Sequence, residues 1–152
     1  MNIYIYYYIM LIKFASIISK YPNIKGILHI GAHECEELND YNLNGITDEN
    51  IIWIEANPNL VASIKKNDNI KIIEACISDV DDETITFNIT NNYQSSSILN
   101  LKDHLVEHPW VYITNTISLK TKTVKTIYDQ NNINPTFANF INIDIQGANY
   151  YV

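Results

Sequence analysis

Residues 27–37 read Ile-Leu-His-Ile-Gly-Ala-His-Glu-Cys-Glu-Glu, and this stretch decides the fold. An apolar strand ends at Gly31, which is followed by a small residue and then by a polar segment that predicts a helix start. A second apolar run, residues 51–54, ends in Glu55. A strand, a glycine turn, a helix and a second strand ending in an acid are typical of nucleotide-type cofactor sites. The glycine lets backbone approach a ligand, and the acid accepts hydrogen bonds from ribose hydroxyls.

The first half of the chain alternates between strand and helix patterns. We predict strands at 25–30, 51–55 and 70–77, and helices at 34–41 and 57–67. The first of these helices has acids in its first turn, where the helix dipole favours them. The second has Asn as its N-cap and Pro at its first position. Such alternation requires a mostly parallel sheet with right-handed crossovers, and α/β is therefore the expected fold class.

The second half reads differently, as a β-rich segment inserted at about 84–123. An acidic turn at 79–83 precedes a strand at 84–90, and residues 111–123 alternate in the manner of a second strand. Ser95–Ser97 show no nucleophile elbow, and we interpret them as part of a flexible loop over the site. The remaining expected elements are a helix at 98–107, a helical turn at 126–131 and a last strand at 137–143 that ends at Asp144.

Length and charge limit the classes of protein. The chain has 152 residues, which suits one domain, and its 47% apolar content argues against disorder. Its formal charge is −7 with no basic run, so we expect no nucleic-acid partner.

The N-terminal residues 1–23 form an apolar segment that we interpret as a helix packed on the sheet, leaving 24–152 as the domain. Lys13 interrupts the apolar run, which is short for a membrane span. We expect a cytoplasmic protein without membrane association, with a signal-anchor as the alternative.

Cysteine and histidine positions do not predict a metal site. Cys35 and Cys76 lie far apart and outside any CxxC motif, so we expect two reduced, buried thiols. His29 and His33 lie near Glu34 and Glu37, but His29 falls inside a strand and should point into the protein.

Four segments in the same order resemble the FkbM-type family of class I S-adenosylmethionine-dependent methyltransferases. They are Leu28–His33, Trp53–Pro58, Ala75–Asp79 and Phe140–Asn149. The resemblance spans roughly residues 24–152 and implies a Rossmann-like parallel sheet with S-adenosylmethionine as cofactor. The sequence departs from the family pattern at a few positions: His29 stands where Asp is common, Cys35 replaces a glycine, and Asn142, Gln146 and Asn149 stand where Lys, Glu and Glu are usual.

The resemblance, together with the rule that ligands bind outside the carboxyl ends of strands, assigns the candidate site residues. The cofactor-binding candidates are Gly31, Ala32 and His33 for the amino-acid portion, Glu55 and Ala56 for the ribose, and Ser78 and Asp79 beside the adenine. Asp144 is the candidate catalytic residue, as a positioning group or a base for a hydroxyl. For each of these positions a purely structural role, as a tight turn, a solvated acid or a helix cap, stays open.

Three functions follow from these interpretations. The first is S-adenosylmethionine-dependent methylation of a hydroxyl on a small molecule, sugar or other glycan acceptor. The chain stops where the helix after the fourth strand should begin, so we expect a truncated domain with an open sheet edge. That edge favours the second function, a non-catalytic remnant or a module that requires a partner, another copy or a missing C-terminal part. The third, a dinucleotide-binding oxidoreductase, is disfavoured by the single clear glycine.

Overall fold

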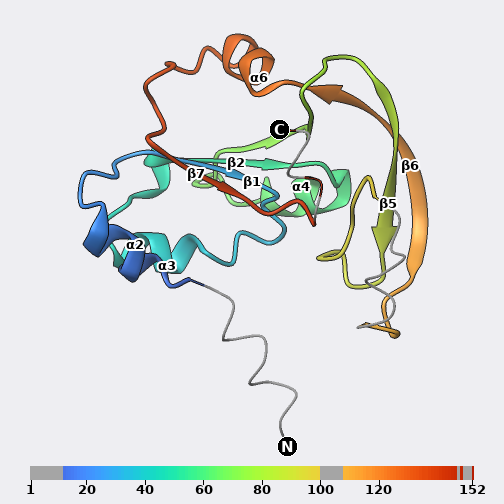
Figure 1. Cartoon of the computed structure of the whole chain (residues 1–152), viewed down its shortest axis with the longest axis horizontal. Coiled ribbons are helices and arrows are strands. Elements are labelled where there is room, and N and C mark those ends of the chain that lie inside the picture. Colours follow the sequence, from blue (N-terminus) through green and yellow to red (C-terminus); the bar gives the residue numbers. More distant parts are fainter. Residues whose placement is uncertain (1–11, 100–107, 147, 149–151) are drawn as a thin grey trace, which may run out of the picture.

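The main sheet has four parallel strands in the order β3-β2-β1-β7. The computed structural model describes residues 12–99, 108–146, 148 and 152 (Figure 1). The strands are β1 (Ile27–Ile30), β2 (Ile51–Glu55), β3 (Ile72–Glu74) and β7 (Phe140–Ile143). This arrangement confirms the predicted Rossmann-like sheet, and its strand order reverses between β1 and β7.

Helices cover both faces of this sheet, as Figure 1 shows. One face packs against α2 (Phe14–Lys20), α3 (Leu38–Leu43) and α4 (Pro58–Ile64), and the other against α6 (Val124–Gln130). A short 3-10 helix, η1 (Asp48–Asn50), precedes β2. All residues of β1 and β2 are buried, because alternate side chains enter the two cores. No helix in the described ranges is long and apolar enough to cross a membrane.

A second sheet stands beyond the carboxyl ends of the parallel strands (Figure 1). Its strands are β4 (Cys76–Ile77), β5 (Thr84–Thr90) and β6 (Ile113–Lys122), in the order β4-β6-β5. β5 and β6 are antiparallel, and β4 runs parallel to β6. The predicted β-rich insertion at about 84–123 is therefore confirmed.

The prediction of one strand over 70–77 is wrong, because this run divides between the two sheets. β3 belongs to the main sheet and β4 to the second sheet. At the junction, the N–H of Ala75 donates to the carbonyl oxygen of Glu55 at 3.0 Å. One residue later, Cys76 pairs with Thr121 of β6. The β-branched pattern of the run predicts extended backbone, but it carries no information about which strand lies beside each part of it.

The start of the predicted helix at 34–41 is also wrong. His33 and Cys35 have φ angles of 44° and 60°, which lie in the left-handed region and interrupt a right-handed helix. α3 therefore begins at Leu38, and Glu34 precedes it instead of lying in its first turn.

Other predicted elements shift at their ends. The first and last strands of the main sheet begin at Ile27 and Phe140, α4 ends at Ile64 and α6 begins at Val124. The predicted helix at 98–107 lies outside the described residues from position 100 onward.

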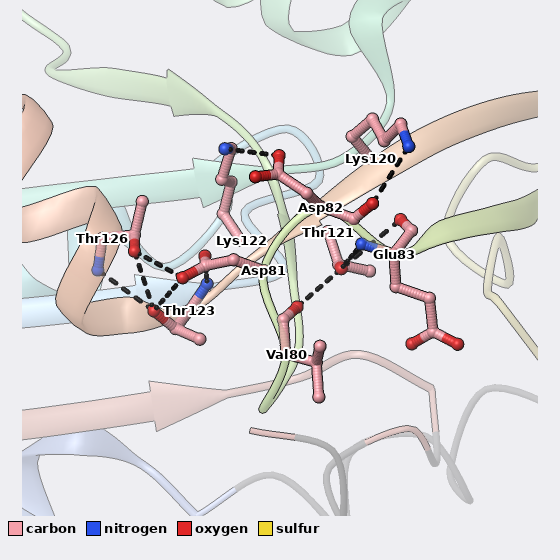
Figure 2. Close-up of polar contacts among 9 residues, drawn as sticks. All are labelled: Val80, Asp81, Asp82, Glu83, Lys120, Thr121, Lys122, Thr123 and Thr126. Atoms are coloured by element: carbon pink, nitrogen blue, oxygen red, sulfur yellow. Dashed lines mark hydrogen bonds and ion pairs between the residues drawn. The ribbon is translucent and has the colours of Figure 1, made fainter.

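The acidic turn between β4 and β5 is tied to the end of β6 and the start of α6 (Figure 2). The Asp81 carboxylate accepts hydrogen bonds from the Thr123 N–H and the Thr126 hydroxyl, both at 2.7 Å. Thr123 is the N-cap of α6, and its hydroxyl accepts from the Thr126 N–H at 3.1 Å. The Thr121 hydroxyl donates to the carbonyl oxygen of Val80 at 2.6 Å. These bonds fix the second sheet against α6 and thus against the main sheet.

Within the described residues, β7 pairs only with β1, so its other edge has no strand beside it. The side chain of Ile141 on β7 is 53% exposed. An unpaired strand edge of this kind presents backbone N–H and C=O groups that are available to pair with another strand.

Candidate active site

The glycine turn after β1 lies directly against the end of β7. Gly31 has a φ of +88°, and a Cβ atom built on it would lie 1.8 Å from the carbonyl oxygen of Asp144. The N–H groups of Gly31 and Ala32 both donate to the carbonyl oxygen of Ile54, at 2.9 and 3.0 Å. Only glycine fits this position, since it combines a left-handed backbone with contact to another chain segment.

A pocket of about 190 Å³ opens at this point, between the carboxyl ends of the parallel strands and the second sheet. It lies where the strand order reverses, which is where open α/β sheets bind ligands. Of the residues predicted from the sequence, Gly31, His33, Glu55, Ala56 and Asp144 line its wall. The topology thus brings three separate sequence segments to one cavity.

Three other predicted residues do not line this pocket. The Ala32 side chain is buried in the core on the α3 face of the sheet. Ser78 is buried, and its hydroxyl donates to the Asp79 carboxylate at 3.2 Å. Ser78 and Asp79 directly follow Ile77, which does line the pocket. Their assignment to the adenine stays a prediction.

Glu55 joins the loops that follow β1 and β2. One carboxylate oxygen accepts from the His33 N–H at 2.9 Å, and the other accepts from the Asn57 N–H at 2.7 Å. The side chain is almost fully buried, and this desolvation raises its pKa. Each oxygen keeps a second lone pair, so the structural role of Glu55 leaves room for a ligand hydroxyl.

Asn57, two residues further along the chain, is fully buried. Its Nδ2 atom has no hydrogen-bond partner within the described part of the chain. A buried amide nitrogen of this kind needs a partner and is thus a candidate donor to a ligand or a water molecule.

His33 and Glu36 form an ion pair on the pocket wall, with 2.7 Å between Nδ1 and the carboxylate. The hydrogen bond raises the pKa of His33 and lowers that of Glu36. Both residues belong to the left-handed loop before α3, which this pair stabilises.

Asp144 and Glu37 line the same pocket, and the charge of Asp144 raises the pKa of Glu37. Desolvation raises the pKa of both carboxyl groups, and the nearby charge of Glu36 raises each pKa further. Gln146 donates from Nε2 to the Asp144 carboxylate at 3.1 Å. A carboxylate with a raised pKa is a better proton acceptor near neutral pH, which suits the predicted role of Asp144 as a base.

Behind the turn, His29 takes part in a buried polar network. Its Nδ1 lies 3.0 Å from the Tyr41 hydroxyl, which also accepts from Nδ2 of Asn142 at 2.9 Å. Its ring stacks on Trp53 with 4.6 Å between centroids. Burial lowers the pKa of His29 to about 4, so the ring is neutral at pH 7. The described residues contain no cluster of three or more His, Cys, Asp or Glu arranged to hold a metal ion.

Both cysteines are free and buried, as the sequence predicted. Burial raises the pKa of Cys35 to about 12 and that of Cys76 to about 11. Neither thiol is therefore a nucleophile at neutral pH.

Sequence reasoning missed several residues of the pocket wall. Glu36 and Glu37 line it because the helix begins later than expected. Tyr93 and Gln94 line it from the loop after β5, next to Ser96, which the sequence had placed in a loop over the site. Tyr93 has a φ of 56°, unusual for an aromatic residue and invisible in the sequence.

The fold and the pocket define a class. A parallel sheet with the order β3-β2-β1-β7, a glycine turn after β1 and an acid at the end of β2 form a Rossmann-like domain, a fold class in which ligands bind at this edge of the sheet.

Comparison with known families narrows this class. Residues 29–152 match the family model of the Methyltransferase FkbM domain, and the chain therefore belongs to the FkbM methyltransferase family. No curated protein and no solved structure matches the chain.

Proposed function

We propose that this protein is an S-adenosylmethionine-dependent methyltransferase that acts on a hydroxyl oxygen. The observation that carries the proposal is the pocket at the strand-order reversal, where Gly31, Glu55 and Asp144 meet in a chain of this family. Methyl transfer breaks a methyl–sulfur bond, leaves its electron pair on sulfur and forms a methyl–oxygen bond, while the hydroxyl proton passes to a base.

The chemistry of the pocket wall fits this cofactor. Glu37, Glu55 and Asp144 supply carboxylates, and the lining residues that the structure describes include neither Lys nor Arg. Carboxylates suit a ligand that carries a sulfonium cation and ribose hydroxyls. The volume of about 190 Å³ lies below the roughly 300–1,000 Å³ of typical ligand pockets, so the described walls enclose only part of such a ligand.

Each wall residue then has a proposed task. The backbone of residues 31–33 would bind the amino-acid portion of the cofactor, and Glu55 would accept from the ribose through its remaining lone pairs. Asp144 would orient the acceptor hydroxyl and take its proton, helped by its raised pKa.

The acceptor would lie on the side of the pocket formed by the loop after β5. Tyr93 and Gln94 line that wall, and no side-chain hydrogen bond occupies either group within the described chain. A phenol hydroxyl and an amide suit a polar acceptor, and we propose a small molecule or a glycan.

Calorimetry with S-adenosylmethionine tests the proposal. We expect saturable binding at one site, weakened about tenfold by Glu55→Gln, because the amide offers fewer acceptor lone pairs. Glu49→Gln is the matched control, since Glu49 lies on η1 before β2, at the opposite end of the sheet. Circular dichroism would show that both variants are folded. A folded wild-type protein that binds NAD but not S-adenosylmethionine would overturn the proposal in favour of an oxidoreductase.

The open edge of β7 supports a second candidate, a module that requires a partner. Size-exclusion chromatography with light scattering distinguishes this candidate from a methyltransferase that works as a monomer. A monodisperse monomer that binds the cofactor would exclude a partner requirement, whereas a stable dimer or higher assembly would favour it.

A further inference from the structure

The charge on the pocket wall is one-sided. Its described lining residues include four carboxylates, from Glu36, Glu37, Glu55 and Asp144, and one imidazole, from His33. Among the described residues that line it there is no lysine or arginine. Any ligand in this pocket is therefore exposed to a negative potential, which low-dielectric walls strengthen.

Two of these carboxylates are already neutralised in part by the protein. Glu36 is paired with His33 at 2.7 Å, and Glu55 accepts from the N–H groups of His33 and Asn57. The charges of Glu36 and Glu55 therefore stabilise the loop after β1 and also contribute to the negative potential of the pocket.

Glu37 and Asp144 have no direct ion-pair partner of this kind; the more distant charge of His33 lowers the pKa of each, against the larger opposing effect of desolvation. Within the described part of the chain, neither forms an ion pair with a Lys or Arg side chain. Glu37 belongs to the turn before α3 and Asp144 follows β7, so two elements that are distant in the sequence place carboxylates on the wall of one pocket. The charge of Asp144 raises the pKa of Glu37, as expected for two carboxylates on one pocket wall.

We infer that the pocket selects its cofactor by charge, holding S-adenosylmethionine more tightly than the product S-adenosylhomocysteine. This inference rests on the proposed function and goes beyond it. The two ligands share their adenosine, ammonium and carboxylate groups. They differ by one methyl group and by the positive charge on sulfur, which methyl transfer removes. The attraction between that charge and Glu37 and Asp144 is lost at the moment of reaction, which favours release of the product.

The size of this preference follows from Coulomb's law. At an effective dielectric of about 20 and a separation of several Å, one uncompensated carboxylate changes the affinity for a cation by about tenfold or more. Because the pocket is open to solvent ions, salt reduces the preference.

Calorimetry on the full chain with three probes tests the inference. The probes are S-adenosylmethionine, S-adenosylhomocysteine and sinefungin, which carries a protonated amine in place of the sulfonium methyl group. At low salt we expect the two cationic probes to bind about tenfold more tightly than S-adenosylhomocysteine. At about 0.5 M salt this ratio should fall several-fold.

The variant Glu37→Gln tests the inference most directly, because it removes one carboxylate charge from the pocket wall and keeps the shape of the side chain. Glu37 makes no side-chain cap hydrogen bond to α3, so the amide should leave the helix intact. We expect the variant to lose affinity for the cationic probes several-fold while S-adenosylhomocysteine binds as before. Glu49→Gln removes the same charge at the other end of the sheet and should leave all three affinities unchanged.

The outcomes separate the two proposals. If S-adenosylhomocysteine binds as tightly as S-adenosylmethionine at low salt, the charge inference is overturned and the proposed function stands. If no probe binds to the folded protein, the proposed function fails and the inference fails with it.

Discussion

The carbonyl oxygen of Asp144 lies 1.8 Å from the position that a Cβ atom on Gly31 would occupy. The Asp144 N–H also donates to the carbonyl oxygen of Ile30 at 2.9 Å, so this contact closes the end of the β1–β7 pair. Gly31→Ala should separate the two strand ends and force a left-handed alanine. We expect a loss of about 3 kcal/mol or more in the free energy of unfolding, measured by urea denaturation.

Gly45→Ala is the matched control for this prediction. Gly45 has a φ of +89°, nearly the same as Gly31, but a Cβ on it meets nothing within 4 Å. Its substitution should cost only about 1–2 kcal/mol of backbone strain. Equal losses in the two variants would show that the contact with Asp144 contributes nothing.

Removal of the buried Tyr41 hydroxyl should destabilise the protein. It accepts from Nδ2 of Asn142, which leaves its own hydrogen for Nδ1 of His29, and its side chain is 2% exposed. Tyr41→Phe would leave two buried groups without this partner and should cost about 1–3 kcal/mol. Tyr112→Phe, at a side chain that is 60% exposed, should change stability by no more than about 0.5 kcal/mol. Thermal and urea unfolding of both variants checks this.

The stability of the protein should fall in acid between the two pKa values of His29. Burial lowers this pKa from 6.5 to about 4, so between these values the unfolded state binds a proton that the folded state does not. The free energy of unfolding should therefore decrease by about 3 kcal/mol as the pH falls through this window. Urea titrations at several pH values measure this free energy of unfolding. In His29→Gln, the free energy of unfolding should depend less strongly on pH.

His33 should act in the opposite direction. Its hydrogen bond to Glu36 raises its pKa, so its contribution to stability is full just below the ordinary His pKa of 6.5, where Glu36 is still ionised, and disappears as the pH rises through the raised value. His33→Gln should consequently make the loss of stability in acid steeper. A shallower loss would contradict the assignment of the ion pair.

Asp81→Asn should weaken the attachment of the acidic turn to α6. Hydrogen bonds from Thr123 and Thr126 lower the pKa of Asp81, so its carboxylate stabilises the fold above its unfolded pKa and stops doing so once it is protonated. We expect a lower melting temperature than wild type at neutral pH and convergence of the two proteins in strong acid. Asp68→Asn, an exposed acid in the turn after α4, serves as the control. A difference that persists unchanged in strong acid would show that the charge is irrelevant.

The main sheet and much of the pocket wall were predictable from the sequence. Apolar runs bounded by Gly31 and by Asn57-Pro58 predict parallel strands, and parallel strands bring their carboxyl ends to one edge. That rule is enough to place Gly31, Glu55 and Asp144 near one another, as the structure does.

Other features depend on information that periodicity does not contain. The left-handed backbone at His33 and Cys35 is not encoded by residue type, so the helix was expected four residues too early. The division of β3 from β4 depends on where β6 lies, which only the assembled structure reveals. For the same reason the far wall with Tyr93 and Gln94 was missed.

The pairing of β1 with β7 joins residues that are far apart in the chain: His29 and Asn142 have a sequence separation of 113. The pocket is built on this pairing, so it exists only in the fully folded domain. A ligand bound there has no site on the unfolded chain, and its binding free energy adds to the stability of the whole molecule. At a ligand concentration one hundred times the Kd, this linkage would amount to about 2.7 kcal/mol. The supply of cofactor would then govern how long the folded protein persists as well as how fast it works.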